Sequence, residues 1–205
     1  MARRILYFDI ETCDADLMYT LPPEEMFRLG GYRWAGDTEV TLTDDLEEMR
    51  RVILEADMVI GHNVISFDLP VIFGVKSDIP LRLAMERRVF DTWTFAVMVH
   101  PAPFKYINRF GEWAFADSPA RAKKWFKLDE QAYQLGTARK TMDLGDLAME
   151  FGDPELKGKE KQKSGFGRIP LDDKRYRAYL VGDVVTTEEV SDALLAPVLD
   201  RKSVV

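Results

Sequence analysis

Two acidic residues, Asp9 and Glu11, stand one residue apart in an apolar run from Ile5 to Thr12. The run is rich in residues that favour strands, and it predicts a buried strand. Because alternate residues of a strand point to the same face, both carboxylates should emerge side by side. Buried anions without a counter-charge are very costly, so either cations balance them or the strand ends at a cleft. A divalent metal site meets both conditions.

Further acidic residues follow at the ends of other predicted elements. A polar block begins at Gly61, where a short buried strand ends, and it delivers Asp68 to the start of a helix. Near the C-terminus, Tyr179 and Asp183 are spaced i and i+4, so they share one face of the last predicted helix. Two divalent ions about 3.5–4 Å apart need several carboxylates, and such a pair activates water and stabilises charge at a phosphodiester. Mg²⁺ and Mn²⁺ prefer oxygen ligands, and no His/Cys cluster indicates zinc.

These three blocks together resemble the three exonuclease motifs of the DEDDy 3′–5′ exonucleases. The motifs are Asp9-x-Glu11, Asn63-x-x-x-Phe67-Asp68 and Tyr179-x-x-x-Asp183, and they occur in this order along the chain. Within that group the motifs are most similar to the proofreading domain of family-A DNA polymerases of phages and bacteria. A single motif is a weak signal, but the resemblance covers nearly the whole chain and the three motifs together are specific.

The resemblance implies a fold and a role for each acidic residue. The fold would be α/β and RNase H-like (ribonuclease H-like), with a central mixed β-sheet flanked by α-helices. Asp9, Glu11 and Asp183 would hold one of two divalent ions, Mg²⁺ or Mn²⁺. Asp9 and Asp68 would serve the second ion, and Tyr179 would orient the attacking water. All five residues would then be catalytic. The tyrosine form of the third motif is favoured because neither histidine of the chain lies near Asp183.

Four residues are candidates for binding the 3′-terminal nucleotide. The resemblance assigns contacts with that nucleotide to Thr12, Asn63 and Phe67. His62 stands beside them and is expected to be a structural, hydrogen-bonding histidine rather than a base. Asp91, with Thr92, is expected to cap the helix that follows it.

Simpler interpretations stay open for two of the predicted catalytic residues. Asp68 can act as the cap of its helix, with or without a metal ion. Tyr179 can be a packing residue with a satisfied hydroxyl, since tyrosine is common where helices meet sheets. Asp183 on an otherwise apolar helix face is harder to explain without a cation.

Two regions rich in cations have a structural and a functional interpretation. Residues 101–127 are expected to be irregular, and residues 157–167 to form a mobile loop. For the second region a solvated loop is favoured over a flap that contacts phosphates. For Trp113, Phe115, Trp125 and Phe126, core packing is favoured over a platform for stacked bases.

The composition predicts one soluble α/β domain. The chain has 205 residues, a formal net charge of −7 and one cysteine, Cys13, so it has no intramolecular disulfide. The negative net charge argues against a protein that binds nucleic acid through its overall charge. No segment is long and apolar enough for a membrane span, and a cytoplasmic location in a bacterium or phage-infected host is expected. Residues 1–205 would be a single exonuclease domain, either standing alone or as a fragment of a longer DNA polymerase.

The predicted function is removal of nucleoside 5′-monophosphates from single-stranded or frayed DNA 3′ ends. The expected partners are that DNA end and a DNA polymerase in cis or in trans, and no membrane. An RNA 3′-end trimmer similar to ribonuclease D is the alternative within the same class. A catalytically silent interaction domain is the alternative outside it, and the presence of all four carboxylates and the tyrosine argues against that reading.

Overall fold

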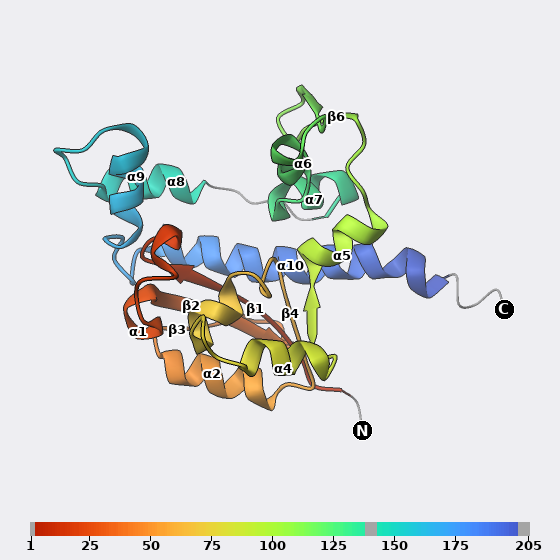
Figure 1. The fold of residues 1–205 in the computed structure, drawn as a ribbon, viewed down its shortest axis with the longest axis horizontal. Coiled ribbons are helices and arrows are strands. Elements are labelled where there is room, and N and C mark those ends of the chain that lie inside the picture. The colour runs from red at the N-terminus through yellow and green to blue at the C-terminus, as the bar shows by residue number, and fades with distance from the viewer. Residues whose placement is uncertain (1–2, 138–142, 201–205) are drawn as a thin grey trace.

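A five-stranded mixed sheet forms the centre of the computed structural model, which describes residues 3–137 and 143–200 (Figure 1). Its strands are β1 (Ile5–Thr12), β2 (Phe27–Trp34), β3 (Thr41–Thr43), β4 (Met58–Gly61) and β5 (Val89–Asp91). They lie in the order β3-β2-β1-β4-β5. The first three strands pair antiparallel, whereas β1, β4 and β5 pair parallel. The predicted α/β class with a mixed central sheet is confirmed, and it is compatible with the expected RNase H-like fold.

Helices cover both faces of this sheet. On one face lie α2 (Leu46–Glu55) and α4 (Ile79–Met85), with α1 (Pro23–Met26) and α3 (Asp68–Phe73) nearby; along the other face runs α10 (Lys174–Asp200) (Figure 1). The 3₁₀ turn η1 (Ala15–Leu17) follows β1 at the end of the sheet. The Asp45 carboxylate caps α2, because it accepts hydrogen bonds from the N–H groups of Glu47 and Glu48. Such a cap satisfies donors that the first helical turn leaves open.

The alternation of β1 directs its acidic residues toward α10. Phe8 and Ile10 are buried in the core beneath α2 and α3. Tyr7, on the opposite face, packs against Val184 of α10. Asp9 and Glu11 share the face of Tyr7, since side chains alternate along a strand.

Glycine in the neighbouring strand lets α10 lie close to the sheet. Gly31 is the residue of β2 paired with Asp9. A Cβ atom at Gly31 would lie 2.9 Å from Cγ of Leu180 and 3.2 Å from Val184. The third motif on α10 is therefore held close to the first motif on β1.

Residues 157–167 form a helix and not the expected mobile loop. α8 (Leu144–Phe151) packs against α9 (Gly158–Phe166). A Cβ atom at Gly165 would lie 1.7 Å from the carbonyl oxygen of Ala148, so the two helices meet backbone to backbone. Arg28 also donates hydrogen bonds to the carbonyls of Phe166 and Ile169. The prediction was wrong because these tertiary contacts outweigh the low helix propensity of the glycine- and lysine-rich segment.

Residues 101–135 form a small subregion that we call the hairpin lobe. It contains the antiparallel hairpin of β6 (Lys105–Ile107) and β7 (Trp113–Phe115), followed by α6 (Pro119–Trp125) and α7 (Leu128–Leu135). The expectation of irregular structure up to residue 127 was wrong. The sequence pattern missed the hairpin because its strands are three residues long, and short strands carry little periodicity.

The hairpin lobe has a hydrophobic core that it shares with Ala96 of α5 (Thr92–Val99) and with Val190 and Leu194 of α10, and α5 joins the lobe to β5. Trp125 is buried in this core, and its indole N–H donates to the carbonyl of His100 at 2.9 Å. Gln131 connects the same two residues, donating to the Trp125 carbonyl at 2.7 Å and pairing with His100 Nδ1 at 2.9 Å. Packing and buried hydrogen bonds thus fix the lobe on α5 and α10.

The helix predicted to carry Tyr179 and Asp183 is confirmed as α10. Among the described helices, none combines the length and the apolar composition that crossing a membrane requires.

Candidate active site

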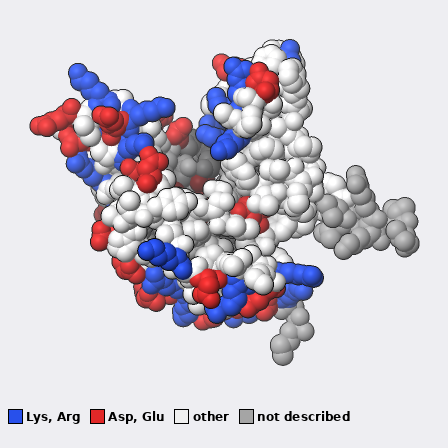
Figure 2. Space-filling view, in the orientation of Figure 1, with Lys and Arg blue, Asp and Glu red and all other residues white. Residues whose placement is uncertain are grey.

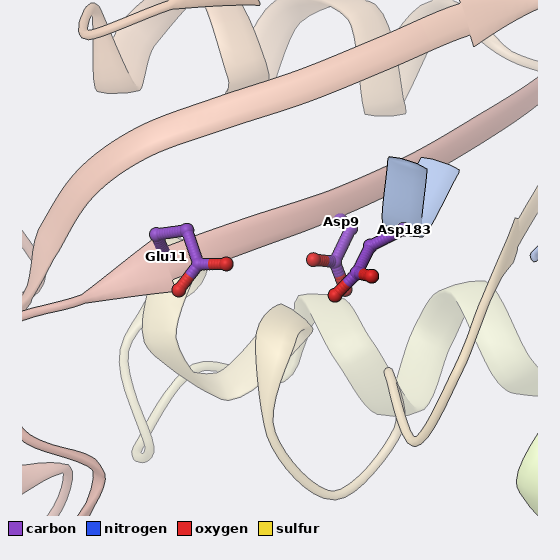
Figure 3. Close-up of side chains that lie close together, drawn as sticks. All are labelled: Asp9, Glu11 and Asp183. Atoms are coloured by element: carbon purple, nitrogen blue, oxygen red, sulfur yellow. The ribbon is translucent and has the colours of Figure 1, made fainter. Parts of the chain in front are cut away.

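Three carboxylates converge where β1 meets α10. Asp9, Glu11 and Asp183 each offer an oxygen, and these atoms all lie within 4.8 Å of one another. Figure 3 shows the Asp9 and Asp183 carboxylates side by side, with Glu11 farther along the same strand. Glu11 is 9% exposed and Asp183 is 5% exposed. Like charges this close and this shielded repel strongly, so a cation bound among them would be strongly stabilised.

The donor set fits a hard divalent cation. All three groups supply carboxylate oxygen, the ligand type that Mg²⁺ and Mn²⁺ prefer. The cluster therefore could bind a metal ion. It is drawn from a central strand and a long helix, elements rigid enough to fix the ligands in advance.

Asp68 reaches the same place from the other side of β1. β4 pairs only with Ile5–Tyr7 of β1, so the later residues of β1 have an open edge on that side. The Asp68 carboxylate accepts hydrogen bonds from the N–H of Ile10 on this edge and from its own N–H. Asp68 is 3% exposed. It is not one of the three carboxylates grouped within 4.8 Å, but it lines the same cleft.

Burial raises the pKa of Asp68 to about 7, and the charges of Asp91 and Asp183 act in the same direction. The two backbone N–H groups oppose this shift without cancelling it. Asp68 therefore carries its proton more readily than an ordinary aspartate when no cation is bound.

Asp91 organises the loop that delivers Asp68. The predicted cap is confirmed, since the Asp91 carboxylate accepts from the N–H groups of Trp93 and Thr94 at the start of α5. It also accepts from the N–H groups of Asn63 and Ile65, each at 3.0 Å. This second set of bonds fixes the loop after β4, and sequence reasoning did not foresee it.

The same loop has an unusual backbone at Asn63. Its φ of 63° lies in the left-handed region, which asparagine tolerates better than most residues. The Asn63 carbonyl accepts from the N–H groups of Ser66 and Phe67. Beside it, His62 Nδ1 lies 2.9 Å from the Thr92 hydroxyl, which itself bonds to the Gly61 carbonyl. The histidine is thus a hydrogen-bonding member of the loop.

Tyr179 packs at the edge of the core and also contacts the carboxylates. It lies against the cluster of α8 and α10 residues, and its hydroxyl hydrogen-bonds to Asp183. Burial raises the pKa of Tyr179 well above its ordinary value, and the charge of Asp183 adds to the effect. The phenol therefore keeps its proton and acts as a hydrogen-bond donor.

Tyr176, one turn before Tyr179 on α10, was not singled out from the sequence. It is 1% exposed, and its hydroxyl has no hydrogen-bond partner among the described residues. Burial and then the charge of Glu11 raise its pKa. Its i, i+3 spacing from Tyr179 was the only signal that could have pointed to it.

The carboxylates open into a cleft of about 390 Å³, which we call the acid cleft. It lies between the hairpin lobe and the helices α8 and α10, where Figure 2 shows the front of the molecule hollowed. The predicted residues that line it are Asp9, Glu11, His62, Asn63, Phe67, Asp68, Tyr179 and Asp183. Thr12 lies outside it and lines an adjoining hollow of about 360 Å³, which also includes Glu11 and Phe67.

The cleft has lining residues that the sequence did not predict. They are Trp93 of α5, Asp143 before α8, and Arg109, Lys127 and Asp129 of the hairpin lobe. Arg109 forms an ion pair with Asp129. None of these residues belongs to a motif, and the fold brings them beside β1 from three separate parts of the chain: α5, the residue before α8, and the hairpin lobe.

Solved structures include several chains that are similar to this one. The chain is similar to a family B DNA polymerase from the hyperthermophilic archaeon Pyrobaculum calidifontis, with 15% sequence identity and a TM-score of 0.43. The match covers 97% of this chain and 25% of that one, so the chain spans about a quarter of that polymerase. No protein-family model and no curated protein matches. The neighbour is a family-B polymerase, whereas the motifs resemble family-A proofreading domains, and membership of the DEDDy group stays a prediction from the motifs.

Proposed function

We propose that the protein is a metal-dependent 3′–5′ exonuclease that acts on single-stranded or frayed DNA. One observation carries the proposal: three carboxylates from motifs at opposite ends of the chain meet within 4.8 Å, at the wall of a cleft. Asp68 and Tyr179, the other two predicted catalytic residues, line the same cleft. A set of this composition suits hydrolysis of phosphodiesters assisted by divalent ions.

The residues of the cleft would have separate roles in binding metal and in positioning water. Asp9, Glu11 and Asp183 would hold one divalent ion, and Asp9 with Asp68 a second. When bound, such ions activate water and stabilise the charge that develops on the leaving oxygen. Tyr179, held as a donor beside Asp183, would position the attacking water. Asp68 would have to lose its proton for this role, and a nearby cation favours the ionised form.

The terminal nucleotide would occupy the space next to the carboxylates. Phe67 lines both the acid cleft and the adjoining hollow, and its ring offers a face for a base. Asn63 lines the cleft beside it, and Thr12 lines the hollow. These residues are proposed to hold the 3′-terminal nucleotide while the carboxylates act on its phosphate.

A labelled-strand assay tests the proposal. The protein is incubated with single-stranded DNA and RNA carrying a 5′ label, in Mg²⁺, Mn²⁺ or EDTA, and the products are resolved by length. We expect stepwise shortening from the 3′ end with DNA and metal, and none in EDTA. No shortening with either metal would overturn the proposal and favour a silent interaction domain. A clear preference for RNA would favour an RNA-trimming enzyme.

A polymerase partner is part of the proposal. The net charge of −7 suits a domain that receives its strand from a polymerase in cis or in trans instead of capturing it by overall charge. Addition of a candidate polymerase with a mismatched primer end should raise the rate of removal if this holds.

A further inference from the structure

The hairpin lobe carries a second cavity, next to the acid cleft. This cavity, which we call the lobe groove, has a volume of about 530 Å³. Arg109, Lys127 and Asp129 line both cavities, so the lobe groove and the acid cleft are neighbours that share part of their lining. Figure 2 shows Lys and Arg side chains, with some acidic ones, on the part of the lobe that borders the hollow.

The lobe groove is lined by cations on an otherwise acidic protein. They are Arg109, Arg121, Lys124 and Lys127. Arg109 pairs with Asp129, and Arg121 pairs with Asp117. Lys124 and Lys127 are exposed, and neither forms an ion pair within the part of the chain that the structure describes. These two lysines are therefore available for phosphate groups.

The acidic residues of the groove are largely engaged. Asp129 is paired with Arg109. Glu130 is 5% exposed, and its carboxylate accepts hydrogen bonds from the Arg109 N–H at 3.2 Å and from Gln134 at 2.7 Å. Glu112 is exposed at the rim of the hairpin. The carboxylates of the groove thus do not neutralise the charges of Lys124 and Lys127.

Aromatic rings stand beside these cations. Phe110 is 70% exposed, Trp113 is 62% exposed and Phe115 is 40% exposed, and all three line the groove. Trp125 and Phe126 of the same lobe are buried in its core. A single exposed ring is common on a protein surface, but several exposed rings that line one groove are typical of a binding site.

The rings are also associated with cations. The Lys105 ammonium lies 4.0 Å from the centre of the Trp113 ring, and the Arg109 guanidinium lies 4.5 Å from the Phe110 ring. Cations and stacked aromatic faces in one groove are the combination that binds single-stranded nucleic acid without regard to sequence. Cations meet the phosphates, and the rings meet the faces of the bases.

We propose that the lobe groove binds single-stranded nucleic acid just upstream of its 3′ end and leads that end into the acid cleft. The inference rests on the proposed function of the acid cleft. Lys124 and Lys127 contact the phosphate backbone, and Trp113 and Phe110 stack on bases. The shared lining at Arg109 and Lys127 places the groove directly beside the cleft that holds the carboxylates.

Binding without cleavage tests the inference. Fluorescence anisotropy of a labelled single-stranded DNA 12-mer is measured in EDTA, so the result does not depend on catalysis. The variant Lys124→Ala/Lys127→Ala is compared with the control Lys76→Ala/Lys174→Ala, which removes two exposed lysines outside both cavities. We expect the groove variant to bind about tenfold more weakly, with a salt slope smaller by about 1.4. We expect the control to bind like the wild type.

A second pair of variants separates stacking from charge. Trp113→Ala is compared with Tyr19→Ala, which removes a ring that is 77% exposed and lines neither cavity. We expect Trp113→Ala to weaken binding about tenfold on a normal strand and to have no effect on an abasic strand. The lysine variant should lose affinity on both strands. Thermal unfolding of each variant verifies that the fold is intact.

The two proposals can fail separately. Wild-type binding with both groove variants equal to their controls overturns the role of the groove, whatever the cleavage assay gives. If the protein binds an acidic polypeptide and does not bind the 12-mer, the inference is also overturned, and the groove is a site for a protein partner. Weakened binding by both groove variants supports the groove even if the wild type fails to cut any strand, in which case only the exonuclease proposal fails.

Discussion

The carboxylate cluster and the lobe groove lie beside each other but are built in different ways. The cluster comes from β1 and α10, a central strand and a long helix fixed by the main core. The groove comes from a hairpin with strands of three residues and from two short helices, which share a small hydrophobic core with α5 and α10. The cluster is a group of carboxylates that a bound cation would stabilise, whereas the groove is lined by cationic side chains that bound phosphates would stabilise. Together they suit a ligand with a phosphate backbone whose end is cut where metal ions bind.

The two regions need different degrees of geometric precision. Metal ligands must be held within about 0.5 Å of the working geometry, and regular elements achieve this better than loops. Contacts to a flexible single strand tolerate more movement, so a hairpin with exposed rings is sufficient. Four changes test whether the two regions are as separate as this comparison states.

The largest effect should come from Asp183→Asn. Loss of a ligand shared with Asp9 and Glu11 should lower the cleavage rate by about 10³-fold or more, equivalent to about 4 kcal/mol. In EDTA the same variant should unfold at an equal or higher temperature, because repulsion among the carboxylates is relieved. Asp37→Asn, an exposed residue in the β2–β3 turn, is the control. A fully active Asp183→Asn protein would exclude the assigned role. Asp9→Asn should be at least as damaging, and more so than Glu11→Gln, because Asp9 is the proposed bridge between the two ions.

The next effect separates the two tryptophans of the hairpin lobe. Trp125→Ala should lower the free energy of unfolding by about 3–5 kcal/mol, since it empties the core of the lobe and removes a buried hydrogen bond. Trp113→Ala should change it by less than about 0.5 kcal/mol. Urea unfolding measures both. Mn²⁺ binding, followed by electron paramagnetic resonance, should survive Trp125→Ala if the carboxylate cluster is independent of the lobe. Lost Mn²⁺ binding would show that the regions are coupled.

A third effect is the pH dependence of stability without metal. The pKa of Asp68 is raised to about 7 in the folded protein, so the folded state holds more protons than the unfolded state between about pH 5 and pH 7. The free energy of unfolding in EDTA should therefore fall as the pH rises through this window, by about 2 kcal/mol. Asp68→Asn should flatten the profile, and Mg²⁺ should oppose the fall. A wild-type profile that is flat in EDTA would contradict the raised pKa.

The smallest effect should come from Tyr179→Phe. The ring keeps its packing while the hydroxyl that bonds to Asp183 is lost. We expect the cleavage rate to fall about tenfold, or about 1.4 kcal/mol, with Mn²⁺ affinity unchanged. Tyr133→Phe, in the hairpin lobe, is a matched control for loss of a phenol. If Tyr179→Phe cleaves at the wild-type rate, Tyr179 is a packing residue only.

The sequence predicted the elements of the main sheet well because their signals are local. The apolar, strand-favouring run of β1, the short apolar run of β4 and the cap at Asp91 each identify an element within a few residues. The meeting of Asp9 with Asp183 was inferred from the resemblance to a family. No local pattern links residues that far apart.

The predictions failed where tertiary contacts decide the structure. α9 has a sequence typical of a loop, and the fit of Gly165 against Ala148 makes it a helix. In the hairpin lobe, core packing was predicted for four aromatic residues alike, whereas Trp125 is buried and Trp113 is exposed. Burial depends on how short elements pack together, which periodicity cannot report for strands of three residues.

The open edge of β1 has a consequence beyond the chemistry of its carboxylates. A central strand normally has partners on both sides, but β1 loses its β4 partner after Tyr7. A backbone N–H that is buried without a partner costs about as much free energy as a lost hydrogen bond. Here the N–H of Ile10 is taken by the side chain of Asp68. The carboxylate that we propose for metal binding thus also completes the hydrogen bonding of the central strand, so its removal should lower the stability of the sheet as well as the activity.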